Sequence, residues 1–127
     1  MKETKFSFAK RLKSFSYAFN GLKILLKEEQ NSRIHTVGAI LAIILSFVLK
    51  ISLLEWMAII FAIGIVFIIE LVNTAIEHIA NFISPEKNIQ IKIIKDLAAA
   101  AVLISAIIAI IIGSIVFLPK IKDYFTA

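Results

Sequence analysis

The sequence predicts an all-α integral membrane protein. The chain is 60% hydrophobic and has a mean hydropathy of +0.93, whereas soluble domains are about half apolar. Its apolar residues gather in blocks long enough to cross a bilayer, and helices satisfy every backbone group of such a segment in lipid. With 127 residues, the chain is expected to form a single domain over 1–127. The absence of cysteine excludes disulfides, thiolate metal sites and a cysteine nucleophile.

Three apolar segments predict three membrane-spanning helices, at about 34–50, 53–69 and 97–118. The most apolar part of the first segment, 37–49, is short, so we expect its helix to continue out of the membrane. The third segment has about the length that a bilayer requires. Ser84-Pro85 interrupts the polar sequence after the second span, and we expect residues 84–88 to form a loop there.

The distribution of lysine and arginine predicts the orientation. By the positive-inside rule, the N-terminus and the connection between the second and third spans face the cytoplasm, and the tail 120–127 lies outside. Beside a membrane span, an excess of basic residues indicates contact with anionic lipid rather than with nucleic acid. Eight basic residues precede the first span: Lys2, Lys5, Lys10, Arg11, Lys13, Lys23, Lys27 and Arg33.

The segment 6–30 has the pattern of an amphipathic helix. Polar and basic side chains occupy its other faces, which suits a helix that lies on the membrane surface. Packing against the protein's own spans is an alternative, and the two interpretations are compatible. The apolar stripe consists of Phe8, Leu12, Phe15, Phe19, Leu22 and Leu26.

A polar helix face follows directly on the second span. Glu70, Asn73, Thr74 and Glu77 have the spacing i, i+3, i+4, i+7, and Asn81 extends the same face. Two carboxylates so placed repel each other unless a proton or a cation lies between them. A solvated helix end is the alternative interpretation, but two glutamates combined with an amide and a hydroxyl favour a functional site.

Two further polar clusters are expected on the same side of the membrane, at residues 27–35 and at Lys95-Asp96. Carboxylates, an amide and a lysine at one membrane face indicate magnesium–nucleotide chemistry, because Mg²⁺ prefers oxygen ligands and lysine neutralises phosphate. The four glycines are scattered and cannot form a P-loop or a glycine-rich kinase loop.

Two motifs together resemble the signature of the prokaryotic diacylglycerol kinase family. They are Glu70-Leu-Val-Asn73-Thr-Ala-Ile-Glu77 and Lys95-Asp96-Leu-Ala-Ala-Ala-Ala-Val102. The resemblance extends from about Phe8 to Phe117. It implies an enzyme of the bacterial inner membrane that uses ATP and Mg²⁺ to phosphorylate a membrane lipid alcohol, undecaprenol or diacylglycerol. It also implies a homotrimeric bundle with active sites between subunits.

The resemblance further implies roles for individual residues. Glu70 is the catalytic base, and Glu29 and Glu77 are the metal-associated carboxylates. The implied nucleotide-binding residues are Lys10, Tyr17, Asn73, Glu86, Lys87, Asn88, Lys95 and Asp96. The implied substrate-binding residues are Arg11, Asn31, Arg33 and His35.

Three basic positions stand out, one lysine and two histidines. Lys10 stands where the family pattern has arginine, with Arg11 beside it. His35 stands where diacylglycerol-specific members carry an acidic residue, which favours the undecaprenol branch; alternatively, His35 caps the start of the first span. His78 is expected to point off the polar face and to play no part.

Two other functions are compatible with the residues alone. One is a small ion-conducting membrane protein, since carboxylates within a membrane often mark ion pathways. The other is a non-catalytic adaptor whose basic helix holds lipid or a partner. Phosphorylation of lipid is predicted only if the protein is a kinase.

Overall fold

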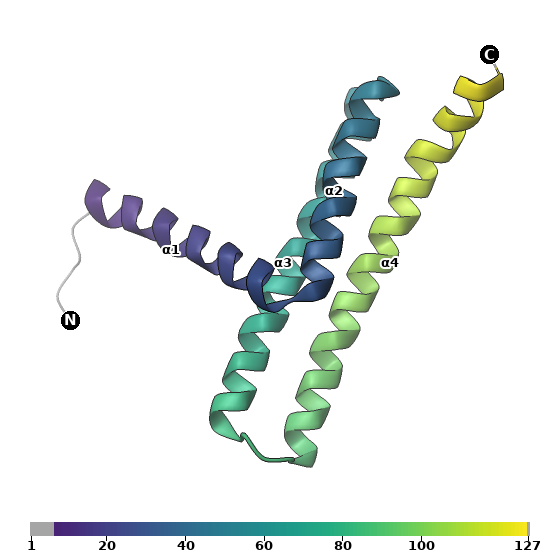
Figure 1. The fold of residues 1–127 in the computed structure, drawn as a ribbon. Coiled ribbons are helices and arrows are strands. Elements are labelled where there is room, and N and C mark those ends of the chain that lie inside the picture. Colours follow the sequence, from purple (N-terminus) through teal and green to yellow (C-terminus); the bar gives the residue numbers. More distant parts are fainter. Residues whose placement is uncertain (1–6, 127) are drawn as a thin grey trace.

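The computed structural model describes residues 7–126, and its regular elements are all helices: α1 (Phe8–Glu28), α2 (Gln30–Val48), α3 (Leu53–Ile83) and α4 (Ile89–Thr126). Figure 1 shows their arrangement. The all-α prediction is confirmed for these residues, and α2, α3 and α4 are each long and apolar enough to cross a membrane. The helix start predicted at residue 6, together with Lys2 and Lys5, lies outside the described residues.

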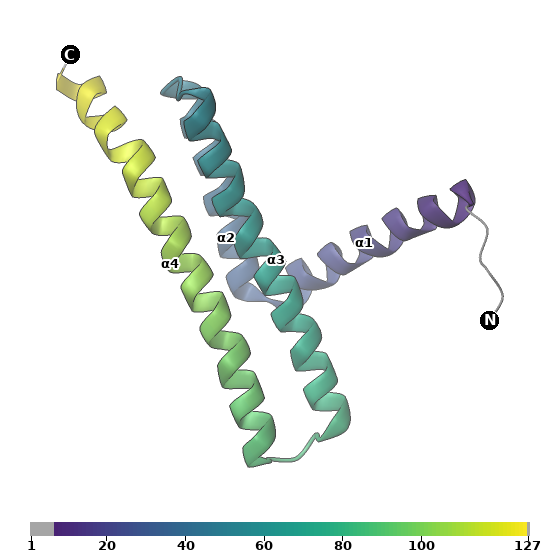
Figure 2. The same ribbon diagram turned by 180° about the vertical axis from the view of Figure 1, so that it is seen from behind.

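A single extended residue separates α1 from α2. The Ser7 side chain caps the start of α1 by accepting a hydrogen bond from the backbone N–H of Lys10 at 3.4 Å. The helix ends at Glu28, and Glu29 has extended backbone angles (φ −105°, ψ 110°). Because the chain changes direction at this residue, α1 projects away from the other three helices (Figures 1 and 2). The start of α2 at Gln30 confirms that the first span belongs to a longer helix.

The turn between α2 and α3 has a left-handed residue that is not glycine. Lys50 has φ 51°. Its N–H donates to the Phe47 carbonyl at 3.3 Å, and the N–H of Ile51 donates to the Ser46 carbonyl at 3.3 Å. These bonds satisfy the last carbonyls of α2 in the manner typical of a helix C-terminus. A side chain in this conformation costs about 1 kcal/mol relative to glycine.

A reciprocal cap begins α3. The Ser52 hydroxyl accepts a hydrogen bond from the N–H of Glu55 at 3.2 Å, and the Glu55 carboxylate accepts one from the N–H of Ser52 at 2.9 Å. This arrangement satisfies two backbone donors that would otherwise lack partners. Glu55 also lies 3.5 Å from Lys120 of α4, so the start of α3 contacts the C-terminal part of α4.

Helices α3 and α4 form a long antiparallel hairpin. They lie side by side in both views (Figures 1 and 2), and residues 84–88 form the expected loop between them. The 31 residues of α3 rise about 46 Å, whereas the apolar core of a bilayer is about 30 Å thick. The polar sequences after the second span and before the third are therefore helical extensions of the apolar segments.

The predicted C-terminal tail is not a segment separate from the third span. Pro119 lies within α4, which continues to Thr126. Proline lacks one backbone N–H and so removes one helical hydrogen bond. The helix nevertheless continues past Pro119, so residues 120–126 of the predicted tail are part of α4.

Most large apolar side chains point outward. The small core of Ile51, Ile59 and Val116 lies near the turn between α2 and α3, where the rings of Phe47 and Trp56 pack edge to face with centroids 4.8 Å apart. Elsewhere most of the large apolar side chains are exposed. Such a surface suits lipid or other membrane helices better than water.

The apolar stripe of α1 is exposed as well. Phe8, Leu12, Phe15 and Phe19 are between 65% and 76% exposed, whereas Leu25, which lies beside the stripe, is fully buried. The contact of α1 with its own chain is therefore concentrated at its C-terminal end. The stripe itself remains available to lipid or to another subunit.

Candidate active site

Glu70 is a buried carboxylate with donors on both of its oxygens. It is 3% exposed and belongs to the part of α3 that follows the apolar segment. The Ser32 hydroxyl of α2 donates to Oε2, and Nδ1 of His35, one turn further along α2, contacts Oε1. An ionised carboxylate only accepts hydrogen bonds, so His35 Nδ1 is then the donor.

The carboxyl groups of Glu29 and Glu77 form a second feature, called here the carboxylate pair. Burial raises the pKa of Glu29, and the charge of Glu77 and a hydrogen bond with the Glu77 side chain raise it further. The charges of Glu28 and Glu70 add smaller contributions in the same direction. The corner between α1 and α2 thus brings acidic residues against α3, and the pair needs a proton or a cation between its members.

Two buried oxygens lie on the same face of α3. Asn73 Oδ1 and Thr74 Oγ1 have no hydrogen-bond partner within the described part of the chain. Leaving a buried polar atom unpaired costs about 1–3 kcal/mol, so such atoms usually receive a ligand or water. Both residues fall between Glu70 and Glu77 along the helix.

The side-chain oxygens of Glu29, Glu77 and Asn73 are of the type that a magnesium ion prefers. Mg²⁺ takes hard oxygen ligands and usually uses one or two protein carboxylates, with substrate phosphates and water completing its shell. The carboxylate pair and Asn73 Oδ1, one helical turn before Glu77 on α3, are oxygens of this kind. Residues 7–126 contain no group of three or more histidine, cysteine or acidic side chains that could hold a metal without such additional ligands.

A cavity of about 620 Å³ lies at the end of the α3–α4 hairpin. It is lined by the loop residues Glu86, Lys87 and Asn88 and by Lys95 and Asp96 of α4, among others. Lys95 Nζ donates to Asn81 Oδ1 at 2.6 Å. We call this the loop cavity, and it brings together five of the residues expected to bind nucleotide.

The loop cavity adjoins the carboxylate face. Asn81 lies on the same side of α3 as Glu77, one helical turn further along. From Glu70 to Asn81 the helix rises about 16 Å. A substrate that occupies the loop cavity could therefore extend along α3 toward Glu70.

Within a single chain, the α1 residues expected to bind nucleotide or lipid lie apart from this site. Lys10, Arg11 and Tyr17 are exposed, and they belong to the part of α1 that projects away from the other helices (Figure 2). Asn31 and Arg33 are exposed near the start of α2, on either side of the buried Ser32.

Some contacts of the site were not expected from the sequence. Ser32 was not singled out, although it stands three residues before His35 and so shares a helix face with it. His35 does not cap α2, which begins five residues earlier. His78, for which no part was expected, pairs with Glu28 at 2.7 Å.

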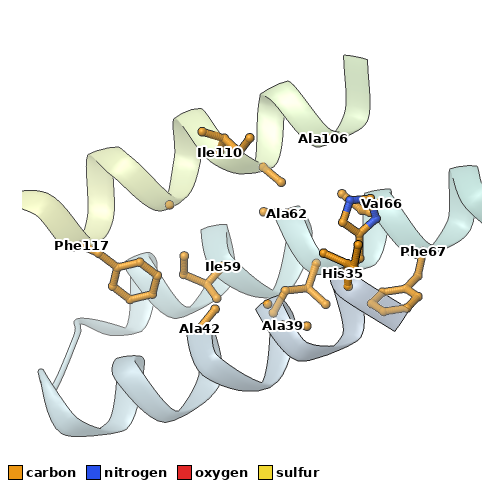
Figure 3. A pocket seen from close by; sticks show the side chains of 15 residues that line it. His35, Ala39, Ala42, Ile59, Ala62, Val66, Phe67, Ala106, Ile110 and Phe117 are labelled. Carbon is orange, nitrogen blue, oxygen red and sulfur yellow. The ribbon is translucent and has the colours of Figure 1, made fainter. Parts of the chain in front are cut away.

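An apolar cavity of about 310 Å³ lies between α2, α3 and α4 (Figure 3). Alanine, glycine, isoleucine, valine and phenylalanine side chains line it, and His35 is the one polar residue among the lining residues. His35 therefore connects this cavity, called here the interhelix cavity, with the carboxylate of Glu70.

Comparison with known proteins yields consistent matches. A family described as "Prokaryotic diacylglycerol kinase" matches residues 16–117. The chain is 40% identical to the undecaprenol kinase of Bacillus subtilis (strain 168) over 109 residues, which cover 86% of this chain and 89% of that protein. It is 33% identical to the diacylglycerol kinase of Synechocystis sp. (87% and 63% covered). It is 30% identical to the diacylglycerol kinase of Escherichia coli (strain K12) (82% and 85% covered).

Proposed function

Because the chain belongs to the prokaryotic diacylglycerol kinase family and is a lipid kinase, a phosphotransferase, we propose that it transfers the γ-phosphoryl group of ATP to the hydroxyl of a membrane lipid alcohol. The observation that carries this proposal is the buried carboxylate of Glu70, which accepts hydrogen bonds from α2 and lies on the helix face that leads to the loop cavity.

The proposed reaction is a direct in-line transfer. Glu70 accepts the proton of the lipid hydroxyl while the hydroxyl oxygen forms a bond to the γ-phosphorus. The bond between that phosphorus and the β–γ bridging oxygen breaks, and ADP leaves. Lys95 offsets negative charge on the transferring group. No covalent phospho-enzyme is required.

The proposed nucleotide site is the loop cavity. Glu86, Lys87, Asn88 and Asp96 line it beside Lys95. The carboxylate pair and Asn73 would hold Mg²⁺, which neutralises phosphate charge when it is bound. The unpaired oxygen of Asn73 and the raised pKa of Glu29 support this assignment.

We place α1 on the cytoplasmic surface of the bacterial inner membrane as an amphipathic helix. Its exposed apolar stripe supports this placement, and its basic residues suit anionic lipid headgroups. The excess of basic residues before the first span supports a cytoplasmic N-terminus and a C-terminus on the outside.

We further propose that the protein is a homotrimer with active sites between subunits. In one chain, the α1 residues Lys10, Arg11 and Tyr17 lie away from the loop cavity, while much apolar helix surface is uncovered. Assembly would cover part of that surface and allow α1 of one subunit to complete the site of a neighbour.

The favoured lipid is undecaprenol. The interhelix cavity offers a single polar side chain, His35, which suits an alcohol with hydrocarbon next to its hydroxyl better than a glycerol lipid with two ester groups. The relative from Bacillus subtilis carries the name undecaprenol kinase. Asn31 and Arg33 are exposed at the same end of α2 and are the proposed contacts to the lipid head, together with Arg11.

A matched pair of variants tests the role of Glu70. Glu70→Gln keeps the size of the side chain but removes its basicity, so lipid phosphorylation should fall about 100-fold or more. Glu55→Gln makes the same change at the other end of α3, where glutamine can still cap the helix, and should leave the rate near that of the parent protein. Equal activity in the two variants would remove Glu70 from the base role.

A further inference from the structure

We propose that His35 is a positioning residue that holds the carboxylate of Glu70 in the orientation in which it accepts the lipid proton. This inference rests on the proposed function. It differs from the lipid-binding role that the family resemblance implies for His35.

The contacts on Glu70 come from one face of α2. Ser32 and His35 are three residues apart, so both side chains reach the carboxylate from the same side, one at each oxygen. A glutamate side chain has three rotatable bonds and can adopt many orientations. With a hydrogen bond at each oxygen, the plane of the carboxylate is fixed relative to α2.

Burial makes these hydrogen bonds necessary. Glu70 is almost completely buried, whereas the His35 side chain is 29% exposed. A buried carboxylate without donors is strongly disfavoured, and it would protonate or turn toward water. The contact with His35 thus helps to hold the buried carboxylate in place.

The position of His35 relative to the interhelix cavity connects this role with the substrate. The imidazole is the polar group among the residues that line the cavity (Figure 3). A lipid alcohol whose hydrocarbon lies in the cavity would bring its hydroxyl to the end where His35 meets Glu70. Misplacement of a catalytic group by about 1 Å can lower a rate about 100-fold, so the orientation of this carboxylate should affect turnover strongly.

The test compares asparagine and glutamine at position 35. The amide N–H of asparagine falls near the position of histidine Nδ1, whereas that of glutamine falls near Nε2. We expect His35→Ala and His35→Gln to lower kcat about 10- to 100-fold, with KM for lipid and for ATP changing less than about threefold, and His35→Asn to recover most of kcat. Thr36→Val, which alters a hydroxyl that bonds only the backbone of Ser32, serves as the control with normal kcat.

A double-mutant cycle separates this role from a merely structural one. If His35 acts through Glu70, then His35→Ala should cause no further loss in the Glu70→Gln background. An equal fractional loss in both backgrounds would overturn the inference, and so would an asparagine variant no more active than the glutamine variant. A loss confined to KM for lipid would assign His35 to lipid binding instead.

The outcomes also distinguish this inference from the function on which it rests. A folded parent protein that transfers no phosphate to lipid would contradict the proposed function. A parent protein that is active, with Glu70→Gln inactive and His35→Ala normal in kcat, would leave the function standing and overturn only the role of His35. Should His35→Ala fail to fold, the comparison of asparagine with glutamine still decides the question.

Discussion

At the scale of single residues, two carboxyl environments lie within a few turns of one helix. Glu70 accepts hydrogen bonds from Ser32 and His35, so its negative charge is compensated by the protein. Burial raises the pKa of Glu29, and the neighbouring carboxyl of Glu77 raises it further. The first environment fixes the orientation of a single carboxylate, and the second suits a pair that binds a cation.

The Glu29→Gln variant should be more stable than the parent protein when Mg²⁺ is absent. Because the pKa of Glu29 is raised in the folded state, the folded protein binds that proton more tightly than the unfolded chain. This tighter proton binding stabilises the folded state at acidic pH, and the stabilisation is lost as the pH rises through the folded-state pKa of Glu29. At neutral pH the substitution removes the repulsion between the carboxylates of Glu29 and Glu77, so the Tm in detergent should rise.

The same variant should lose its response to magnesium. Mg²⁺ should raise the Tm of the parent protein at neutral pH, since a ligand that binds the folded state stabilises it, but should have little effect on Glu29→Gln. Equal magnesium stabilisation of both proteins would place the ion elsewhere.

Much of the residue-level site could be predicted from spacing along one helix. The positions of Glu70, Asn73, Thr74 and Glu77 follow from helical periodicity alone. The contacts from Ser32 and His35 could not be predicted in this way, because they depend on which face of α2 packs against α3. The exposed positions of Lys10 and Tyr17 also depend on the change of direction at Glu29. A glutamate at this position does not by itself predict an extended residue between two helices.

At the scale of elements, the ends of the helices hold the bundle in its arrangement. The Ser52–Glu55 cap and the Glu55–Lys120 contact join α3 to the C-terminal part of α4. Leu25 is the fully buried side chain of α1. Apolar runs and Pro85 were sufficient to predict the helices, but their ends were not predictable from hydropathy, because helices continue into polar sequence that lacks a breaker.

Lys50→Gly should stabilise the protein by about 0.5–1 kcal/mol. Lys50 has a positive φ at the end of α2, and glycine adopts this conformation without a steric penalty. Lys50→Ala removes the same charge but keeps the Cβ atom, so it should give no increase in Tm. A gain in the alanine variant equal to that in the glycine variant would show that charge, not backbone conformation, is responsible.

Leu25→Ala should detach α1 from the other helices at a cost of about 2–4 kcal/mol. Limited proteolysis with trypsin provides the readout, since Lys23 and Lys27 flank the anchor and cleavage there should become faster. Leu26→Ala removes a side chain of the same size that is 37% exposed and should change the cleavage rate little. Similar rates in the two variants would contradict the anchoring role of Leu25.

At the scale of the whole molecule, one chain brings together most, but not all, of the residues that we propose for the kinase site. The loop cavity, the carboxylate pair and Glu70 belong to the same chain, while α1 carries Lys10 and Tyr17 away from them. The number of spans could be predicted from the sequence alone. The arrangement of subunits in a trimer is implied only by the resemblance to the family, because no feature of the apolar faces in the described residues specifies a partner.

Mixing two inactive variants tests whether sites form between subunits. If Tyr17 of one chain serves the site of a neighbour, then Tyr17→Ala and Glu70→Gln chains that are unfolded together and refolded should regain activity. Mixed trimers would contain some sites with both residues intact. The specific activity of the mixture should exceed the sum of the two variants refolded separately. No gain, with subunit exchange shown by crosslinking, would contradict shared sites.

The most direct test of the account is transfer of label from γ-labelled ATP with Mg²⁺ by the purified protein in mixed micelles that contain undecaprenol and diacylglycerol together. We expect labelled undecaprenyl phosphate, less label in phosphatidic acid, and almost none in either lipid with Glu70→Gln. Absence of label from both lipids in a folded parent protein, or undiminished label with Glu70→Gln, would contradict it.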